Sequence, residues 1–481
     1  MREESEKIAS NTLVQIIGRV FVLVISLASI KLITNYLGTQ GTGYYSTIVT
    51  YFSLFIVLAD FGFFSVAVRE ISKAPEKSKT ILTNIFTIRF ISALVVTLIA
   101  VLIVFFTGYA AEIKNGVIVA ALYPLFNLAS SIYDMLFQAK LEMQKVVIAE
   151  VISRMVALLG VGIAVIFNLG FYPIIFTVSL SAMVSFIVKA VFSRKELGIA
   201  FGRDKQIILW ITKMALPLGI VFIVNNLYFR VDTLILFYYK GAVDVGIYSV
   251  AYRVLETTLF AGSYLASSLK PLFATSINTD RAKTEKMLSQ SLTFLLFMAL
   301  IITSVCLSLP KEIILFLSNN QFIGGAGALT ILGFATIFIY LSGVLGEIMI
   351  AKDMRKILLI ISVFILIFNV GLNIILIPRY SYIGAAYATL FSEIVLLSLG
   401  FLAASRVVTI RPDYLRIFKL ILVGAVSVIL SIALKKVVPN FILIFLFNII
   451  FYLTVSYLID AVPRETINSY LITYKKRWRA K

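Results

Sequence analysis

Long apolar stretches separated by short polar segments recur along the chain from Asn11 to Asp460. Each is about twenty residues or longer, the length an α-helix needs to cross a hydrocarbon core of about 30 Å. Prolines and glycines mark several of their ends, as at Pro310 and Pro378. The pattern predicts an all-α integral membrane protein of about fourteen transmembrane helices.

The expected helices are separated by short connections, of which the longest run to about 16 residues, so none of them can hold a soluble domain. In chain order the helices are expected at residues 10–37, 43–68, 80–107, 114–138, 145–168, 171–192, 207–237, 246–274, 285–309, 324–350, 355–377, 382–404, 414–434 and 440–461.

The composition agrees with a membrane protein. Of 481 residues, 60% are hydrophobic and 14% are charged, whereas about a quarter of a soluble protein is charged. The net charge of +19 would suit a nucleic-acid partner, but about 30 of the basic residues lie in the termini and in alternate loops, as the positive-inside rule requires. We therefore expect a cytoplasmic-membrane protein with both termini in the cytoplasm, including a basic tail from Lys475 to Arg479, and no nucleic-acid partner.

Two residue types that carry much enzyme chemistry are scarce. The chain has one cysteine, Cys306, and no histidine, which excludes an internal disulfide, a thiol metal cluster and the commonest general base. It also has no D-x-D motif and no loop large enough for a glycosyltransferase site. We therefore expect no enzyme.

A repeated motif divides the chain. The G-x4-G-x-Y-S pattern of Gly38–Ser46 returns at Gly241–Ser249, and a weaker match links the segment 139–145 with 351–356. Each pair is a little over 200 residues apart and opens equivalent helices on the same side of the membrane, which indicates a parallel repeat. Two such lobes around a shared cavity are typical of an alternating-access transporter. The expected organisation is residues 1–193 as the N-lobe (helices one to six), 194–206 as a cytoplasmic linker, 207–404 as the C-lobe (helices seven to twelve), and 405–481 as helices thirteen and fourteen with the tail.

Charged residues within the predicted helices are costly, at about 2.5–3.5 kcal/mol each or more. Arg19, in the first helix, has no acidic residue within four positions. An aqueous cavity that receives an anion explains such an arginine, because a guanidinium binds pyrophosphate through paired, charge-assisted hydrogen bonds. The alternative is a cross-helix ion pair with Asp60. With Arg253 and Arg230, these two residues form the candidate substrate-binding set.

Other intramembrane charges have simpler explanations. Glu150 and Arg154, at i, i+4, are expected to neutralise each other. Arg253 and Glu256, at i, i+3, can do the same or face the cavity. Glu393, in the twelfth predicted helix, is expected to face the interior of the protein, a partner group or water. Residues near predicted helix ends are expected to extend to the membrane interface; these are Lys31, Lys213, Arg89, Asp134 and Glu347.

A set of oxygen-bearing residues predicts a cation site. Asn369 and Asn373 lie one turn apart, as do Ala385 and Thr389, so each pair shares a helix face. With Asp232 they offer one carboxylate, two amide oxygens, a hydroxyl and a main-chain carbonyl, which suit a hard cation such as Na⁺. Alternatively, the Asn and Thr side chains hydrogen-bond helices together.

Several motifs resemble those of the polysaccharide-export, O-antigen type of flippase in the multidrug, oligosaccharidyl-lipid and polysaccharide exporter superfamily. They are the Gly38–Ser46 segment, Ala59-Asp-Phe-Gly62, Arg69-Glu-Ile-Ser72, and the segment from Ile377 to Thr389, which is close to the family pattern I-P-x-Y-G-x-x-G-A-A-x-A-T. The resemblance covers essentially the whole chain. It implies a V-shaped pair of six-helix lobes that enclose a cationic cavity and rock between inward-open and outward-open states, with a groove for the lipid tail at helices thirteen and fourteen.

The related lipid II flippases provide a residue-level comparison. The resemblance implies that Arg19 and Arg253 match cavity arginines of that branch, and that the five residues of the cation set match its sodium site. The chain departs where Asn373 replaces a possible carboxylate, where Ile25 replaces a second arginine of helix one, and in lacking the basic residue of helix two. A different polyprenyl-linked glycan is therefore expected in place of lipid II.

The functional prediction is a transporter that flips a polyprenyl-pyrophosphate-linked oligosaccharide across the cytoplasmic membrane by alternating access. We expect a Na⁺ or H⁺ gradient to drive it, with no other cofactor, since no G-x4-G-K-[ST] motif is present. The expected partners are the lipid-linked glycan, membrane lipids and glycan-assembly enzymes, and the protein itself is expected to be a monomer. The alternatives are a lipid II flippase and an exporter of small toxic cations, whose cavity should be acidic or aromatic.

Overall fold

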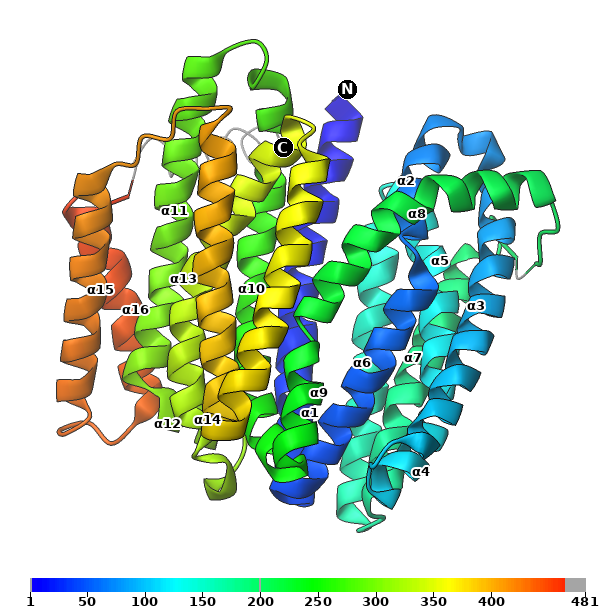
Figure 1. Ribbon diagram of the computed structural model, residues 1–481, viewed down its shortest axis with the longest axis horizontal. Coiled ribbons are helices and arrows are strands. Elements are labelled where there is room, and N and C mark those ends of the chain that lie inside the picture. The colour runs from blue at the N-terminus through cyan, green and yellow to red at the C-terminus, as the bar shows by residue number, and fades with distance from the viewer. Residues whose placement is uncertain (1, 199, 463–481) are drawn as a thin grey trace. The chain divides into compact units, whose positions relative to one another are not determined.

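The computed structural model describes residues 2–198 and 200–462; the basic tail around Lys475 lies outside them. The described residues form helices and no β-strand, which confirms the all-α prediction (Figure 1). Eleven of these helices are long and apolar enough to cross a membrane. The expected count of about fourteen spans stays a prediction.

The chain divides into two compact units. The first comprises Met1–Ser249 with Leu317–Gln321, and the second comprises Val250–Phe316 with Phe322–Lys481. The segment 207–249, which the sequence repeat assigns to the C-lobe, belongs to the first compact unit. The lobe boundaries based on the repeat stay a prediction.

The helices of the first unit are α1 (Arg2–Asp60), α2 (Phe63–Lys73), α3 (Ser78–Phe106), α4 (Ala111–Val119), α5 (Leu122–Ala139), α6 (Met143–Ile166), α7 (Phe171–Ser193), α8 (Lys205–Tyr228) and α9 (Val231–Lys240), with a short 3-10 turn at Pro75–Lys77. Helix α10 (Ala242–Ser276) begins in the first unit and continues into the second.

The helices of the second unit are α11 (Arg281–Ser308), α12 (Pro310–Leu317), α13 (Gly325–Ala351), α14 (Arg355–Ser405), α15 (Tyr414–Leu434) and α16 (Phe441–Leu458). The last residue of α12 and the first two residues of the 3-10 turn Asn320–Phe322 belong to the first unit.

Two helices are too long for a single membrane crossing. The apolar part of α1 has 44 residues and α14 has 51, which at 1.5 Å per residue would give straight rods of roughly 65 and 75 Å. Both are broken, α1 at Gly38 (φ 64°) and α14 at Ser381 (φ 52°). A positive φ ends the regular helix and turns the chain. Each helix therefore has a first and a second arm, and the breaks fall where the sequence predicted the loops after helices one and eleven.

Apolar side chains on the outside of the helices explain how the protein meets its solvent. Along α3, Leu98 and Leu102 are more than half exposed, and Ile166 at the end of α6 is 78% exposed. A surface this apolar is unsuitable for water. It is the expected surface of helices that contact lipid.

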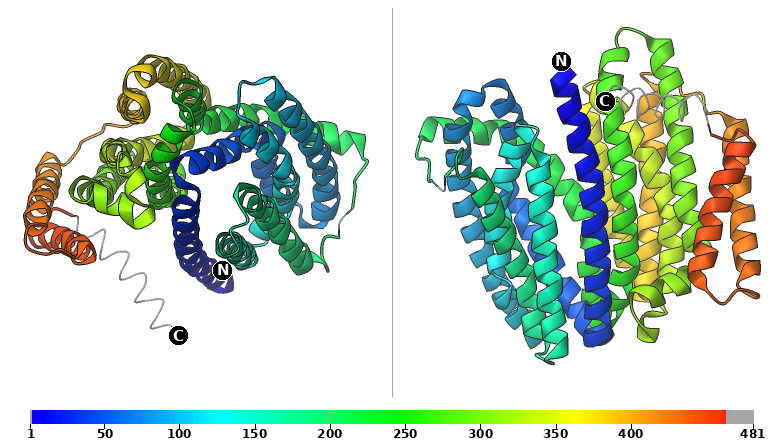
Figure 2. Two further views of the ribbon diagram at one scale, coloured as in Figure 1. Left: turned by 90° about the horizontal axis from the view of Figure 1, so that it is seen from below. Right: turned by 180° about the vertical axis from the view of Figure 1, so that it is seen from behind.

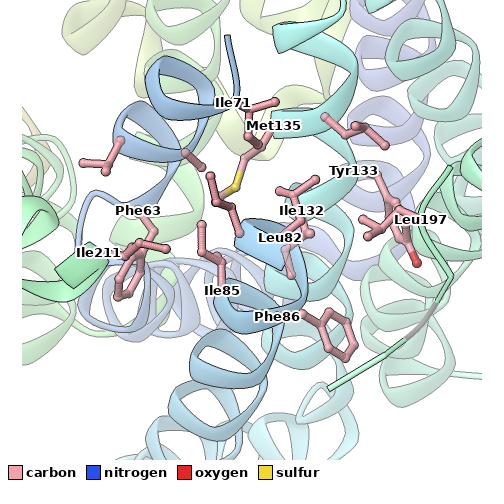
Figure 3. Packing of buried hydrophobic residues seen from close by; sticks show 14 of the residues in the cluster. Phe63, Ile71, Leu82, Ile85, Phe86, Ile132, Tyr133, Met135, Leu197 and Ile211 are labelled. Atoms are coloured by element: carbon pink, nitrogen blue, oxygen red, sulfur yellow. The ribbon is translucent and has the colours of Figure 1, made fainter. Parts of the chain in front are cut away.

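The first unit has a close-packed apolar core at one end. Phe63 and Ile71 of α2 meet Leu82 and Ile85 of α3 and Met135 of α5 (Figure 3). The amphipathic helix α2 supplies one wall of this core through its apolar face, with Arg69 and Lys73 on its polar face. The core fixes α2, α3, α5 and α8 against one another.

In the second unit, polar side chains join α15 and α16 to α11. Asn448 of α16 accepts a hydrogen bond from Ser304 Oγ of α11 at 2.8 Å and donates to Ser431 Oγ of α15 at 2.9 Å. All three residues are buried. Helices α15 and α16 lie beside α11 (Figure 1). Because buried polar groups without partners are costly in a membrane, this network determines how the three helices pack.

The two copies of the repeated motif take the same backbone conformation and contact each other. Gly38 and Gly241 have φ/ψ values of 64°/−170° and 79°/−170°. A methyl group on Gly43 would lie 1.8 Å from the carbonyl oxygen of Ala242, and one on Gly246 would lie 2.0 Å from that of Thr39. Thr39 and Ala242 are equivalent positions of the motif, so the contact is reciprocal. Only glycine permits backbones to approach this closely.

Gly43→Ala and Gly246→Ala are therefore expected to lower stability by about 1–3 kcal/mol each through overpacking. The measurement is the thermal unfolding midpoint of the purified protein in detergent. Gly371→Ala, in α14, is the control because nothing lies within 4 Å of its added methyl group. That control should be neutral or stabilising by up to about 1 kcal/mol. An unchanged midpoint for Gly43→Ala would contradict the close contact.

Candidate functional site

Arg19 lies in the first arm of α1 and forms an ion pair with Glu150 of α6, with Nη1 and Oε2 2.9 Å apart. The two helices pack side by side (Figure 2). The prediction that Arg19 is unpaired is therefore wrong, and so is the alternative prediction that it pairs with Asp60. The predicted pair of Glu150 with Arg154 is also wrong, and the Arg154 side chain is exposed. The sequence could not identify this partner because the pair joins two helices. The Arg19 side chain remains 42% exposed.

Asp60, at the end of α1, instead forms an ion pair with Arg89 of α3. Arg89 also donates to Ser131 Oγ of α5, and its side chain is 1% exposed. The expectation that Arg89 extends to the membrane interface is wrong, because the carboxylate and hydroxyl allow its charge to be buried within the bundle.

Asp134, one turn from Ser131 on α5, pairs with Lys189 of α7 at 2.7 Å. Lys189 is 4% exposed, and it is not among the intramembrane charges predicted from the sequence. Asp60 and Arg89 thus connect α1 to α3, and Asp134 and Lys189 connect α5 to α7. The hydrogen bond from Arg89 to Ser131 of α5 links the two ion pairs. This arrangement balances two negative and two positive charges, as a structural network within a membrane requires.

The second unit contains the predicted pair on α10. Arg253 Nη1 lies 3.0 Å from Glu256 Oε2, and the Arg253 side chain is 40% exposed. Arg230 lies in the first unit at the break between α8 and α9, where its φ of −127° interrupts the helix. Arg19 and Arg253 therefore share a type of environment, that of a half-exposed guanidinium beside a carboxylate.

Asp232, in the first turn of α9, is 2% exposed and fully hydrogen-bonded. Its Oδ2 accepts from the Tyr248 hydroxyl at 2.7 Å, and its Oδ1 accepts from the Thr233 amide at 2.7 Å. Tyr248 belongs to the second copy of the repeated motif, so its hydroxyl ties α10 to α9. The sequence carries no signal for this bond, because a tyrosine in an apolar helix is ordinarily packed among apolar side chains.

The other four residues of the predicted cation set lie in the two arms of α14, in the second unit. Asn373 Nδ2 donates to the carbonyl oxygen and Oδ1 of Asn369, both at 2.9 Å, and Asn369 Nδ2 donates to Ser392 Oγ at 3.1 Å. Ala385 and Thr389 lie on the second arm, and both are buried. Oδ1 of Asn373 is buried without a hydrogen-bond partner. These contacts agree with the alternative that the Asn side chains hydrogen-bond helices together. They also leave the amide oxygen of Asn373 without a hydrogen bond. The cation site as a whole stays a prediction.

A shallow apolar groove of about 540 Å³ lies between α1 and α6. Its lining combines small and branched apolar residues with one cation, Lys31: Ala28, Lys31, Leu32, Leu158, Leu159, Gly162, Ile163 and Ile166. This lining suits lipid chains and lacks the several donors that a sugar or a pyrophosphate requires.

The long broken helices, lipid-facing apolar surface and paired intramembrane charges define a multi-pass membrane protein of the transporter type. The profile of the polysaccharide biosynthesis proteins matches residues 6–277, more than half of the chain, and the MatE profile matches residues 217–375. The chain therefore belongs to the polysaccharide biosynthesis protein family, within the superfamily named from its motifs. No curated protein sequence matches the chain.

Solved transporter structures share the fold. The lipid II flippase MurJ in its inward closed conformation aligns with a TM-score of 0.78 and 16% identity, over 95% of this chain and 100% of that one. The MATE transporter VcmN of Vibrio cholerae, as its D35N mutant, gives 0.61 and 14% over 83% and 96%. A superfamily transporter from Pyrococcus furiosus gives 0.58 and 14% over 83% and 95%. The predicted fold class is thereby confirmed.

Breaking the buried network should destabilise the protein strongly. Asp60→Asn or Arg89→Gln alone is expected to cost about 3–5 kcal/mol, because each leaves an uncompensated buried charge. The double variant should cost less than the sum of the two. Thermal midpoints in detergent test this.

The matched control is Asp353→Asn, which removes an ion pair with Arg355 whose two side chains are 79% and 71% exposed. It should leave the midpoint unchanged within the range of about 0–1 kcal/mol that is typical of surface pairs. Additive effects in the Asp60 and Arg89 double variant would refute the network.

Proposed function

We propose that the protein flips a polyprenyl-pyrophosphate-linked oligosaccharide between the leaflets of the cytoplasmic membrane by alternating access. The observation that carries the proposal is the half-exposed Arg19 guanidinium within a membrane-spanning helix. Membership of the polysaccharide biosynthesis family supports a glycan substrate. The fold shared with a lipid II flippase supports movement of a lipid-linked head group.

The ion pair of Arg19 with Glu150 fits a role in substrate exchange. In the aqueous cavity that this proposal requires, a partly exposed pair is worth only about 0–1 kcal/mol, so a pyrophosphate with greater charge can displace the carboxylate. Arg253 and Glu256 provide the same arrangement in the second unit. In the proposed cycle the head group replaces both carboxylates in the inward-open state, and the lobes then close over it. Binding of a cation near Asp232 then favours the return.

The structural pairs of the first unit are poor candidates for this exchange. Arg89 and Lys189 are 1% and 4% exposed, so a pyrophosphate could reach them only if the bundle opened. Asp60, which was predicted to contact substrate, is bound to Arg89. We therefore place Arg19, Arg253 and Arg230 at the head group and Asp60 in the scaffold.

A second candidate function is export of small organic cations, which the MatE match over residues 217–375 and the MATE structures favour. Such a cavity needs carboxylates or aromatic rings free to receive a cation. Glu150 and Glu256 are instead paired with arginines. Cells that lack the gene should show unchanged sensitivity to dyes and quaternary ammonium compounds under the flippase proposal. Hypersensitivity that the gene reverses would favour the exporter.

Neutral substitutions separate substrate binding from ion pairing. Glu150→Gln removes the ion-pair partner of Arg19 and leaves the arginine charged. Flipping should therefore continue near the wild-type rate. Arg19→Gln combined with Glu150→Gln removes both charges and should reduce flipping about 10–100-fold, because charge-assisted hydrogen bonds of about 1.5–3 kcal/mol are lost. Arg253→Gln with Glu256→Gln should behave likewise.

The measurement is restoration of surface glycan in cells that lack the gene, at matched protein levels, followed by reconstitution into vesicles with a fluorescent lipid-pyrophosphate oligosaccharide. Exposure of the glycan to an impermeant reagent reports flipping. Normal flipping in the Arg19 and Glu150 double variant would reject Arg19 as a substrate ligand, and lipid II flipped in place of other glycans would identify the lipid II alternative.

A further inference from the structure

The groove between α1 and α6 lies on the same pair of helices as the Arg19–Glu150 ion pair. Arg19 contacts Glu150 near the start of both helices, and Lys31 and Gly162 line the groove at an equal distance further along each. The two helices therefore run in the same direction, side by side (Figure 2). The groove follows the second half of α6 and belongs entirely to the first unit.

Small residues on both helices create the groove. Behind it, Ile33 of α1 packs against Val161 and Ala164 of α6, and all three side chains are buried. On the outer face the lining residues include Ala28 and Gly162, whose side chains are too small to fill the space between the helices. Nothing lies within 4 Å of a methyl group added at Gly162, so a larger side chain there would extend into the groove.

The outer wall of the groove is apolar and open to the surroundings of the protein. Leu159, Ile163 and Ile166 are 62%, 52% and 78% exposed, and all three line the groove. Exposed branched side chains on a membrane-spanning helix contact lipid. The groove is therefore reached from the lipid phase.

Contacts at both ends fix the distance between α1 and α6. On one side, a methyl group on Gly18 would lie 1.8 Å from the side chain of Val147, so the helices are in close contact there. On the other, the Tyr36 hydroxyl donates to Asn168 Oδ1 at 2.7 Å and accepts from the amide of Gly170 at 2.9 Å, which ties α1 to the loop after α6. The groove is thus already formed, with a volume of about 540 Å³ within the usual range of ligand sites.

Lys31 gives the groove a positive charge. It is half-buried, and among the described residues that line the groove it is the one cation, with no carboxylate beside it in that lining. A lysine in this position packs its apolar stem against the helices while its ammonium group extends toward the membrane interface. One ammonium group suits a ligand with a single negative charge and a long apolar chain.

We propose that this groove binds one anionic phospholipid, with an acyl chain between α1 and α6 and the phosphate at the Lys31 ammonium group. Lipid chains are as apolar as the helices, so burial of a chain does not itself select a lipid. The shape of the groove and the charge of Lys31 do so. A lysine near an anionic lipid surface favours binding about fivefold. The bound lipid contacts both helices and so holds the first arm of α1 against α6.

The test is native mass spectrometry of the purified full-length protein in detergent, titrated with phosphatidylglycerol or with phosphatidylcholine of the same acyl chains. The first molecule of phosphatidylglycerol should bind the wild type about fivefold more tightly than the first molecule of phosphatidylcholine. Lys31→Gln should bind the two lipids equally. Gly162→Leu should lose this first binding step for both lipids, because the leucine side chain occupies the groove.

Two variants make the same changes elsewhere. Lys213→Gln removes an exposed lysine of α8 in the same unit, and Gly371→Leu adds a leucine to α14 at a glycine whose added methyl group also meets nothing within 4 Å. Both should bind lipid as the wild type does. Gly162→Leu should keep the thermal midpoint of the wild type in detergent, since leucine favours a helix over glycine. If it does not, Ala28→Leu fills the groove from α1 and replaces it in the comparison.

A fivefold preference for phosphatidylglycerol in Lys31→Gln would overturn the proposal, and so would wild-type lipid binding in the variants that fill the groove. Displacement of phosphatidylglycerol by a lower concentration of polyprenyl phosphate would assign the groove to a carrier lipid and reject a phospholipid. A dimer that Gly162→Leu dissociates would assign it to a second copy of the chain, with the same consequence. Because no glycan is present, failure of the flippase proposal would leave these results unaffected.

Discussion

A charge placed in hydrocarbon has to be matched by an opposite charge, and this constraint organises the first unit. Asp60 pairs with Arg89, and Asp134 pairs with Lys189. Each pair connects different helices, so α1, α3, α5 and α7 can occupy the membrane together only in the arrangement that brings these groups into contact. The apolar cores around this network could form with many similar packings. The ion pairs permit far fewer, because a misplaced arginine would be left without its carboxylate.

The ion pairs fall into two groups according to their exposure. Arg89 and Lys189 are almost completely buried, whereas Arg19 and Arg253 are about 40% exposed beside their carboxylates. Full burial stabilises a fixed structure, since separation of the partners would leave both charges in a medium of low dielectric constant. Partial exposure permits exchange of partners at little cost. The same chemical groups can therefore serve the scaffold in one place and ligand exchange in another.

The sequence predicted the helices well because their length and apolar character arise from the membrane itself. The breaks near Gly38 and Ser381 were also predictable, the first from its glycine and the second from the nearby Pro378. The ion-pair partners of the charged residues on other helices could not be predicted from the sequence. Spacing along a helix identifies neighbours on that helix, as it did for Arg253 and Glu256, but the partners of Arg19 and Asp60 lie on other helices. Those pairs depend on helix packing, which one sequence does not specify.

The reciprocal contact between the two glycine motifs has a consequence for the origin of the fold. Equivalent residues touch each other's backbone, so the surface around Gly43 is complementary to its own duplicate around Gly246. Self-complementarity of this kind is the property of an isologous interface, by which two identical subunits associate about a twofold axis. An ancestor with a single repeat would thus have carried a ready dimer interface, and fusion of two genes would have turned that association between molecules into a contact within one chain.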